Sequence, residues 1–352
     1  MGFDSLLRDW DGEFLVSRSD EPTGAWMFIG VHSTVLGPAM GGTRLKAYGS
    51  PEDALHDVLR LSGAMTMKQA AADLPYGGGK AVLAVPSVPA PGSEERRRLL
   101  LRYADLIDSI GGIYVTAADM NTCQDDMDVV AERTAHVLGR SPGRGGAGDP
   151  AIGTAIGLFH GIEATCRETF GSDALSGRSI LIQGCGAVGD RLADHLSDAG
   201  AVLLLADIDA ARAASTAARV GGTVIGADQA VGTPCDVYAP CATGGVLSAE
   251  TIPRLECRAV AGAANNQLAT SEDGQRLREA GIVYAPDYVV NAGGVIWLAG
   301  YETLGWDEAE MNARLTGIGD TLGTVFAEAR EAVISTAEAA DRLALARLAA
   351  AR

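Results

Sequence analysis

Three ionisable residues in the first half of the chain have the types and spacing needed for proton-transfer chemistry: Lys68, Lys80 and Asp119. Lys68 shares one face of a predicted helix with Leu61 and Ala64, because residues spaced by three and four lie on the same side of a helix. Lys80 follows three glycines and leads straight into an apolar strand. Asp119 follows another predicted strand and stands just before a predicted helix.

Together, these three groups are of the kinds that the oxidation of an amino acid requires. That reaction needs a cation for the substrate carboxylate, a base that activates water against an imine, and a proton carrier for the nitrogen. A lysine with its ordinary pKa of about 10.4 is a poor base near neutral pH. Burial and a neighbouring cation both lower the pKa of a lysine, and two lysines in one glycine-lined cleft could supply both effects.

Each of the three residues also has a simpler interpretation. Lys68 could extend its ammonium group to solvent or contact the C-terminal end of its helix. Lys80 could be a surface lysine after a glycine turn, and residues 74–80 do not form a nucleotide-binding P-loop, because Ala81 follows the lysine. Asp119 could cap the helix that follows it.

A glycine motif in the second half of the chain has the spacing of a dinucleotide-binding turn. The sequence G-x-G-x-x-G lies between a predicted strand at 179–183 and a predicted helix at 190–199. In this context the glycines let the backbone turn tightly and approach a pyrophosphate at the positive end of the helix. A turn that needs glycine only for packing, or a methyltransferase-type nucleotide fold, is the alternative. The residues predicted to bind the cofactor here are Gly184, Gly186, Ala187, Val188 and Gly189.

Asp207 ends the next predicted strand, 18 residues after Gly189. An acidic residue at about this distance can accept hydrogen bonds from the ribose hydroxyls of adenosine. The same carboxylate would repel a 2′-phosphate, so the sequence predicts NAD rather than NADP as the cofactor.

The elements that must position these residues follow from apolar patterns and helix signals. Ser50 and Pro51 predict the start of a helix that should run to about residue 72. The first half is further predicted to contain strands at 26–31, 80–85 and 113–117 and helices at 94–110 and 124–137. The second half alternates helices with predicted strands at 179–183, 201–206, 223–225, 235–239, 258–262 and 282–284. The chain from Asp307 onward is predicted to be almost wholly helical.

This pattern predicts an α/β fold with two domains. Strands that alternate with helices indicate a parallel, doubly wound sheet of the Rossmann type, expected for residues 149–332. Residues 1–148 are expected to form a substrate-binding and catalytic domain with a mixed sheet, against which part of 333–352 packs. The Gly- and Pro-rich run at 141–150 is interpreted as the hinge between the two domains, which a cleft would separate.

Composition narrows the partners and the compartment. The formal charge of −17 disfavours nucleic acid and anionic membranes as partners. The start of the chain lacks the features of a secretion signal, and the six cysteines are scattered, so the cytoplasm is predicted. The five histidines are dispersed, so no metal site is expected, and no G-x-S-x-G motif supports a serine hydrolase.

Seven segments in the same order resemble the glutamate/leucine/valine/phenylalanine dehydrogenase family. They span most of the chain, which a lone glycine loop would not do. The segments are 37–44 (G-P-A-M-G-G-T-R), 74–80 (L-P-Y-G-G-G-K), 116–119 (T-A-A-D), 148–150 (G-D-P), 240–245 (P-C-A-T-G-G), 263–268 (A-A-N-N-Q-L) and 291–294 (N-A-G-G).

The resemblance implies a role for each matched residue. Lys68 would hold the substrate carboxylate, Lys80 would act as general base on the attacking water, and Asp119 would carry a proton to and from the substrate nitrogen. Gly42 and Asn265 would also contact the substrate. The cofactor would be lined by Asp149, Thr154, Cys241, Ala242, Asn265 and Asn291. The family also implies a homo-oligomer and a cleft that closes on the substrate.

The expected substrate is an apolar L-amino acid. In glutamate-specific relatives a lysine matches Met40 and a serine matches Val295, so a glutamate side chain would be buried here without a partner. The resemblance favours L-phenylalanine, converted to phenylpyruvate and ammonia, with leucine or valine as the alternative. An NAD-dependent 2-hydroxy-acid dehydrogenase and a non-catalytic NAD sensor are more remote alternatives.

Overall fold

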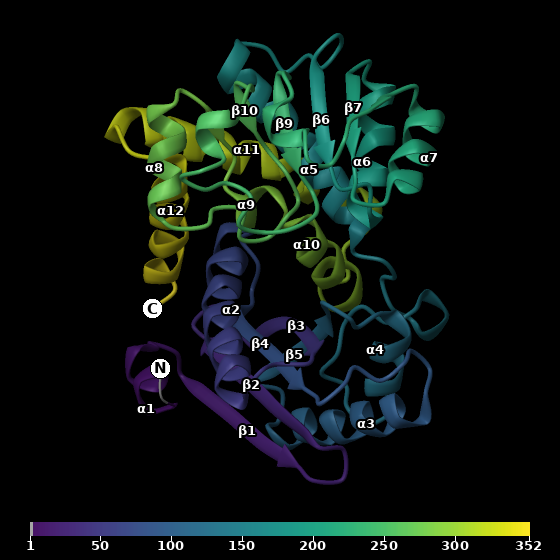
Figure 1. The fold of residues 1–352 in the computed structure, drawn as a ribbon. Helices are drawn as coiled ribbons and strands as arrows, with labels where there is room; N and C mark the ends of the chain where they lie inside the picture. The colour runs from purple at the N-terminus through teal and green to yellow at the C-terminus, as the bar shows by residue number, and fades with distance from the viewer. Residues whose placement is uncertain (1–2) are drawn as a thin grey trace. The chain divides into compact units, whose positions relative to one another are not determined.

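The computed structural model of the chain describes residues 3–352, with the side chains of residues 3, 4 and 9 left aside. These residues form two compact units, and both can be followed in Figure 1. The first unit comprises the chain up to Asp149 together with Leu298–Gly305 and Ala344–Arg352. The second unit comprises Pro150–Trp297 and Trp306–Leu343.

The first unit contains a mixed five-stranded sheet with the order β1-β2-β4-β3-β5. Its strands are β1 (Phe14–Asp20), β2 (Ala25–Ser33), β3 (Ala39–Lys46), β4 (Gly77–Ala84) and β5 (Tyr114–Ala118). The pair β1–β2 and the pair β2–β4 are antiparallel, whereas β3 runs parallel to both β4 and β5. The prediction of a mixed sheet is therefore confirmed, although β1 and β3 were not predicted.

Helices cover both faces of this sheet. Successive side chains of a strand point to opposite faces, and β4 illustrates the result. Ala81 and Leu83 belong to the core that the sheet forms with the third and fourth helices, whereas Val82 packs toward the second helix. The helices of this part of the chain are α1 (Phe3–Asp9), α2 (Pro51–Ala71), α3 (Glu94–Ser109) and α4 (Gln124–Val130).

Two helix predictions can be compared directly with the structure. The start of α2 is as predicted, because the side chain of Ser50 accepts a hydrogen bond from the Asp53 N–H. The prediction of a helix up to residue 137 is wrong, since α4 ends at Val130. Val137 instead forms a parallel bridge with Thr116 of β5 and joins the core. Because β5 is an edge strand, its free backbone groups offer this segment pairing that outweighs its local helical pattern.

The second unit contains a six-stranded parallel sheet with the order β11-β10-β9-β6-β7-β8. This is the doubly wound order of a Rossmann-type fold, as the sequence predicts. Every predicted strand is present, although several are shorter than predicted. The strands are β6 (Ser179–Gln183), β7 (Val202–Ala206), β8 (Thr223–Val224), β9 (Val237–Pro240), β10 (Ala259–Val260) and β11 (Val283–Tyr284).

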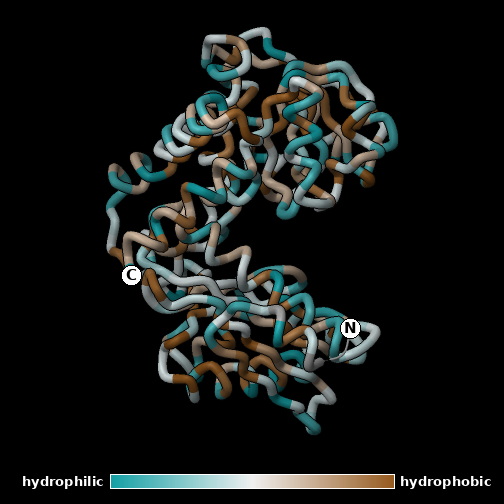
Figure 2. Tube along the Cα trace, turned by 90° about the vertical axis from the view of Figure 1, so that its left-hand side faces the viewer, coloured by the Kyte–Doolittle hydropathy of each residue, from teal (hydrophilic) through white to brown (hydrophobic). Residues whose placement is uncertain are grey.

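Helices also surround the second sheet, and the C-terminal part of the chain is helical as predicted. Hydrophobic stretches alternate with hydrophilic ones along the chain in Figure 2, as expected where helices cover a buried sheet. No helix in the described part of the chain is long and apolar enough to cross a bilayer. The remaining helices are α5 (Ala151–Phe170), α6 (Ala187–Asp198), α7 (Ala210–Val220), α8 (Glu272–Glu279), α9 (Asp287–Val290), α10 (Gly293–Ala299), α11 (Glu308–Ala332) and α12 (Thr336–Ala350).

Candidate active site

Lys80 and Asp119 form an ion pair in the first unit, in which Lys80 is buried and Asp119 is half-buried. Lys80 lies on β4 and Asp119 directly follows β5, and the Lys80 Nζ is 3.1 Å from the Asp119 Oδ2. Only 5% of Lys80 is exposed, so it is not a surface lysine. Asp119 does not cap the helix that follows, because Cys123 occupies the N-cap position of α4 and forms a capping box with Asp126. The simpler interpretations of these two residues are therefore wrong.

The glycines before Lys80 belong to the strand and not to a turn. The prediction that this strand begins at Lys80 is wrong, because β4 begins at Gly77 and is buried over its whole length. A Cβ atom at Gly78 would lie only 2.0 Å from the Thr66 Oγ1 of α2. Glycine is needed here because it lets α2, which carries Lys68 in its last turn, pack directly against β4.

Gly42 of β3 allows Asp119 to approach the sheet. A Cβ atom at Gly42 would lie 2.8 Å from the Cβ of Asp119 and 2.7 Å from the Ala118 carbonyl oxygen. Both distances are shorter than real Cβ contacts allow, so any larger residue would displace the carboxylate. This geometry indicates that Gly42 leaves space for the side chain of Asp119.

Arg44 completes the cluster and was missed as a functional residue by the sequence analysis. Its Nε donates to the Asp119 Oδ2 over 3.2 Å, and its Nη1 donates to the Asp57 Oδ2 of α2 over 2.7 Å. The hydroxyl of Tyr48 donates to the same oxygen of Asp57 over 2.7 Å. Two cations, Arg44 and Lys80, therefore converge on one carboxylate oxygen.

The charges in the cluster alter the pKa values of the pair. Burial lowers the pKa of Lys80, Asp119 opposes this effect, and the nearby guanidinium of Arg44 adds to it. Burial alone would raise the pKa of Asp119, but the charges of Lys80 and Arg44 lower it to about 2. The cluster thus offers an ionised carboxylate beside an amine that loses its proton more readily than an ordinary lysine. These properties suit Lys80 to act as a general base.

The lysine content of the sequence is a signal that could have strengthened the prediction. Only three of the 28 basic residues are lysines, and the others are arginines. Lys46 is exposed at the end of β3, while Lys68 and Lys80 are the two that were predicted to act on the substrate. Arginine is effectively always protonated and can replace lysine where only a charge is needed, but not where a proton must be released.

The glycine motif of the second unit has the geometry of a phosphate-binding turn. Gly184 has φ of 103°, which suits the tight turn after β6. A Cβ at Gly189 would lie 1.9 Å from the Gly184 carbonyl oxygen, so this glycine is needed for close packing. A Cβ at Gly186, by contrast, would meet no described atom within 4 Å. The middle glycine therefore leaves open space at the N-terminus of α6, where a pyrophosphate would approach.

Asp207 follows β7 beside this turn. Its Oδ2 accepts a hydrogen bond from the Cys185 N–H over 2.8 Å, and its Oδ1 accepts one from the Asp209 N–H over 2.8 Å. The Arg212 Nη1 lies 3.8 Å from the Asp207 Oδ2. Asp207 is thus fixed next to the motif, as the ribose prediction requires, with one cation close to it.

Comparison with known proteins gives the same result over the whole chain. Two family profiles match it: Glu/Leu/Phe/Val dehydrogenase, dimerisation domain, over residues 19–136, and Glutamate/Leucine/Phenylalanine/Valine dehydrogenase over residues 205–352. The chain belongs to this dehydrogenase family. It is therefore an amino-acid dehydrogenase, and it uses NAD in the oxidative deamination of its substrate.

Individual relatives cover nearly the full length. A leucine dehydrogenase from Bacillus cereus is 42% identical over 343 residues, which are 97% of this chain and 92% of the relative. A valine dehydrogenase from Streptomyces virginiae is 42% identical over 97% of this chain and 94% of its own length. The crystal structure of L-tryptophan dehydrogenase from Nostoc punctiforme is 36% identical, with a TM-score of 0.84 over 99% of both chains.

Except for Asp149, the other predicted cofactor residues of this dehydrogenase occupy loops and helix ends of the second unit. The Asn291 Nδ2 donates to the Asn265 Oδ1 over 2.9 Å and to the Ala263 carbonyl over 3.1 Å. The buried Oδ1 of Asn291 has no hydrogen-bond partner among the described residues, so it remains available to a donor on a ligand. The Thr154 hydroxyl, in the first turn of α5, donates to the Pro150 carbonyl over 3.0 Å.

Cys241 and Ala242 follow the end of β9, beside the glycine motif. A Cβ at Gly184 would lie 2.8 Å from the Cβ of Ala242, which places this loop against the turn. Burial raises the pKa of the Cys241 thiol to about 12, so it stays protonated and does not act as a nucleophile. Cys241 and Ala242 therefore fit a role as lining residues of the dinucleotide site.

The predicted substrate residues are divided between the two units. Met40 is 1% exposed on β3, Lys68 is half-buried in α2, and Gly42 adjoins Asp119. These residues and Asp149 belong to the first unit, while Asn265 and the half-buried Val295 of α10 belong to the second. The structure thus brings Gly42, Lys80 and Asp119 together.

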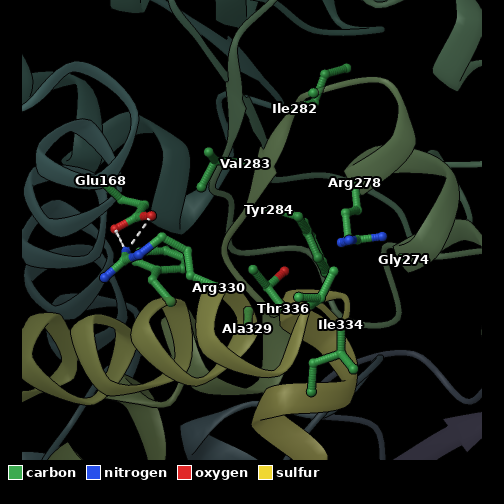
Figure 3. A pocket seen from close by; sticks show the side chains of 13 residues that line it. Glu168, Gly274, Arg278, Ile282, Val283, Tyr284, Ala329, Arg330, Ile334 and Thr336 are labelled. Carbon is green, nitrogen blue, oxygen red and sulfur yellow. Dashed lines mark hydrogen bonds and ion pairs between the residues drawn. The ribbon is translucent and has the colours of Figure 1, made fainter.

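A well-formed cavity of about 350 Å³ in the second unit is not part of this chemistry (Figure 3). Apolar side chains such as Tyr284 and Phe326 line it, and Glu168 and Arg330 form an ion pair beside it. It contains none of the residues predicted to bind cofactor or substrate. The candidate catalytic residues are therefore those of the Lys80 cluster in the first unit, and the candidate cofactor residues are those of the glycine motif in the second.

Exchange of Asp207 is expected to relax the choice of cofactor. In Asp207→Ala the negative charge is lost while Arg212 remains, so NADP use relative to NAD should rise by about tenfold or more. The ratio of kcat/KM values for NAD and NADP measures the effect. Asp207→Ser is a second neutral variant, whose hydroxyl can still form a hydrogen bond. An unchanged ratio in both variants would contradict the assignment of Asp207 to the ribose.

Proposed function

We propose that this dehydrogenase converts apolar L-amino acids reversibly to the 2-oxo acid and ammonia, with Lys80 as general base and Asp119 as proton carrier. The observation that carries the proposal is the contact between the buried Lys80 and the half-buried Asp119, whose nitrogen and oxygen are 3.1 Å apart. The two groups of a fully exposed pair would be solvated and would keep their ordinary pKa values. A lysine buried beside Asp119 and Arg44 has the altered proton affinity that such chemistry needs.

Each protein group has a defined task in the proposed mechanism. Lys68 binds the substrate carboxylate through its ammonium group. NAD held at the glycine motif of Gly184 to Gly189 would supply the hydride acceptor for the oxidation of the substrate α-carbon. Lys80 in its neutral form takes the proton from the water that attacks the resulting imine. Asp119 receives a proton from the substrate nitrogen and returns it to the nitrogen of the carbinolamine. As the C–N bond breaks, the carbinolamine hydroxyl proton leaves with the ammonia as ammonium, Asp119 is again ionised, and Lys80 passes the proton taken from water to solvent, so both groups regain their starting state.

We propose a branched aliphatic amino acid, leucine or valine, as the preferred substrate. Met40 is an uncharged, soft side chain that is 1% exposed at the position where a cation would be needed for glutamate. Relatives named leucine and valine dehydrogenase, both 42% identical, support this choice. Phenylalanine stays a prediction from the sequence, and the likeness to a tryptophan dehydrogenase keeps an aromatic substrate as the second candidate.

A substrate panel tests the proposal. Reduction of NAD is followed by absorbance with leucine, valine, phenylalanine, tryptophan and glutamate, and the reverse reaction is run with and without ammonia. The expected result is highest kcat/KM with leucine or valine, none with glutamate, and NADH oxidation that depends on ammonia. Oxidation without ammonia would indicate a hydroxy-acid dehydrogenase, and NAD binding without turnover of any substrate would indicate a sensor. A preference for phenylalanine would favour the original sequence prediction.

Introduction of a cation at Met40 is expected to admit glutamate. In Met40→Lys the new ammonium group supplies a partner for the side-chain carboxylate, so kcat/KM for glutamate relative to leucine should rise about tenfold or more. Met40→Leu is the matched control, because it keeps an apolar side chain of similar volume. No gain for glutamate in the lysine variant would count against a side-chain pocket at Met40.

The location and assembly of the chain also belong to the proposal. All six cysteines are free thiols, which suits the predicted cytoplasmic location. A homo-oligomer is expected, and the family profile that matches residues 19–136 is described as a dimerisation domain. Light scattering of the purified chain measures its oligomeric state.

A further inference from the structure

Arg44 holds two acidic side chains at once. Its Nε contacts Asp119 and its Nη1 contacts Asp57, and only 16% of its side chain is exposed. A guanidinium group is planar, so two simultaneous contacts of this kind fix both its position and its plane. Neither the substrate prediction nor the cofactor prediction uses Arg44.

Asp57 is itself anchored from several sides. Besides Arg44, it accepts hydrogen bonds from the Tyr48 hydroxyl over 2.7 Å and from the Arg60 Nη2 over 2.9 Å. Its side chain is 14% exposed, so these bonds are only partly screened by water. Asp57 therefore connects α2 to the strand that carries Arg44, and it holds the guanidinium in place.

The four side chains form a row in which the charge alternates. Asp57 contacts Arg44, Arg44 contacts Asp119, and Asp119 contacts Lys80. The Arg44 Nε and the Lys80 Nζ both contact the Oδ2 of Asp119. The permanent positive charge of Arg44 therefore lies close to the amino group of Lys80. A change at one end of this row must be felt at the other.

We propose that Arg44, anchored by Asp57, is a positioning residue that orients the Asp119 carboxylate and keeps Lys80 available as a neutral base. The role assigned to Lys80 rests on the proposed function. Arg44 acts through Asp119 and Lys80 and need not touch the substrate. Loss of Arg44 would leave Asp119 with one cation instead of two, and that cation would be Lys80, which must then stay protonated.

The signs of the electrostatic effects give a specific test. The charged groups that act on Lys80 are Asp119 after β5, Arg44 on β3, and Asp57 on α2. Asp119 and Asp57 raise the pKa of Lys80, and Arg44 lowers it. Replacement of Arg44 by a neutral residue should therefore raise the pKa of Lys80, and replacement of Asp57 should lower it. A purely structural role would not give shifts of opposite sign.

The small number of lysines makes the pKa of Lys80 directly measurable. The full chain, labelled with [6-¹³C]lysine, should give three lysine signals, which Lys46→Arg and Lys68→Arg assign by loss of one signal each. The chemical shift of Lys80 is then titrated in the wild type, in Arg44→Gln and in Asp57→Asn. Arg60→Gln is the control, because Arg60 contacts Asp57 but is 45% exposed and is not in contact with Asp119.

The expected result is an upward shift of about one pH unit for Lys80 in Arg44→Gln and a smaller downward shift in Asp57→Asn. Arg60→Gln should leave the titration near that of the wild type. No shift in Arg44→Gln, or shifts of the same sign in both test variants, would overturn the proposal. If Arg44→Gln does not fold, Asp57→Asn still decides, because an unchanged or raised pKa would contradict the charge row. The titration needs no turnover, so a failure of the deamination proposal would be seen separately, in the substrate panel.

Discussion

Replacement of Lys80 by alanine is expected to lower kcat by about 10³-fold or more while leaving NADH affinity within about twofold of the wild type. The variant removes the proposed general base, whereas the glycine motif lies in the second unit and is untouched. Stopped-flow turnover and NADH fluorescence titration measure the two quantities on the same preparation. Activity close to that of the wild type would refute the role of Lys80.

Lys46→Ala is the matched control for this variant. Lys46 lies on the neighbouring strand β3 but is exposed, so its removal should leave kcat nearly unchanged. The wild-type enzyme should also show a specific pH dependence. Because the base must be neutral, kcat/KM should rise as pH rises through the pKa of Lys80, which lies below the ordinary lysine value of 10.5. In Lys80→Ala this rise should disappear from the residual activity.

Replacement of Asp119 by asparagine is expected to lower kcat by about 10²- to 10⁴-fold. Asparagine has nearly the same shape but cannot carry a proton between solvent and the substrate nitrogen. The same change removes an anion that raises the pKa of Lys80, so the rise of kcat/KM with pH should move to lower pH. Measurement of the complete pH profile therefore separates the two effects of one substitution.

The control for this variant is Asp105→Asn. Asp105 lies on α3 of the same unit and is 52% exposed, with its nearest cation, Arg133, at 3.9 Å. Its neutralisation should change neither kcat nor the pH profile, because exposed pairs at this distance contribute little. A shift of the Asp119→Asn profile to higher pH would be inconsistent with the proposed charge arrangement.

The second unit could be predicted well because its information is local. Each strand is a short apolar run bounded by helix or turn signals, and a parallel sheet with both faces covered requires such runs. The motif at Gly184–Gly189 could be recognised because its spacing is local in the sequence. The structure gives a separate reason for glycine at each position, such as the φ of 103° at Gly184 and the open space at Gly186.

The first unit was harder to predict because its important residues are constrained by contacts with residues far away in the sequence. Strand β3 was missed, since Gly41 and Gly42 in its middle are typical of loops. In the structure a Cβ at Gly41 would lie 1.7 Å from the Gly79 carbonyl oxygen, so the close approach of the neighbouring strand requires glycine at this position. The local pattern of apolar residues does not reveal such a requirement.

The same dependence on distant contacts limited the prediction of the candidate site. Lys68, Lys80 and Asp119 could be predicted because their residue types suit the chemistry and because the family resemblance implies a role for each. Arg44 and Asp57 are 13 positions apart on a strand and a helix, and nothing in their spacing indicates that they pair. Their contact depends on the packing of α2 against the sheet, which only the tertiary structure defines.

The scarcity of lysine also has a consequence for the chemical durability of the chain. Compounds with a ketone group, such as the 2-oxo acids formed by amino-acid dehydrogenases, condense with free amines to give Schiff bases. Of the three lysines only Lys46 is exposed, because Lys68 is half-buried and Lys80 is buried. Arginine supplies nearly all the positive charge of the surface. The protein therefore exposes very few side-chain amines that its 2-oxo acid product could modify.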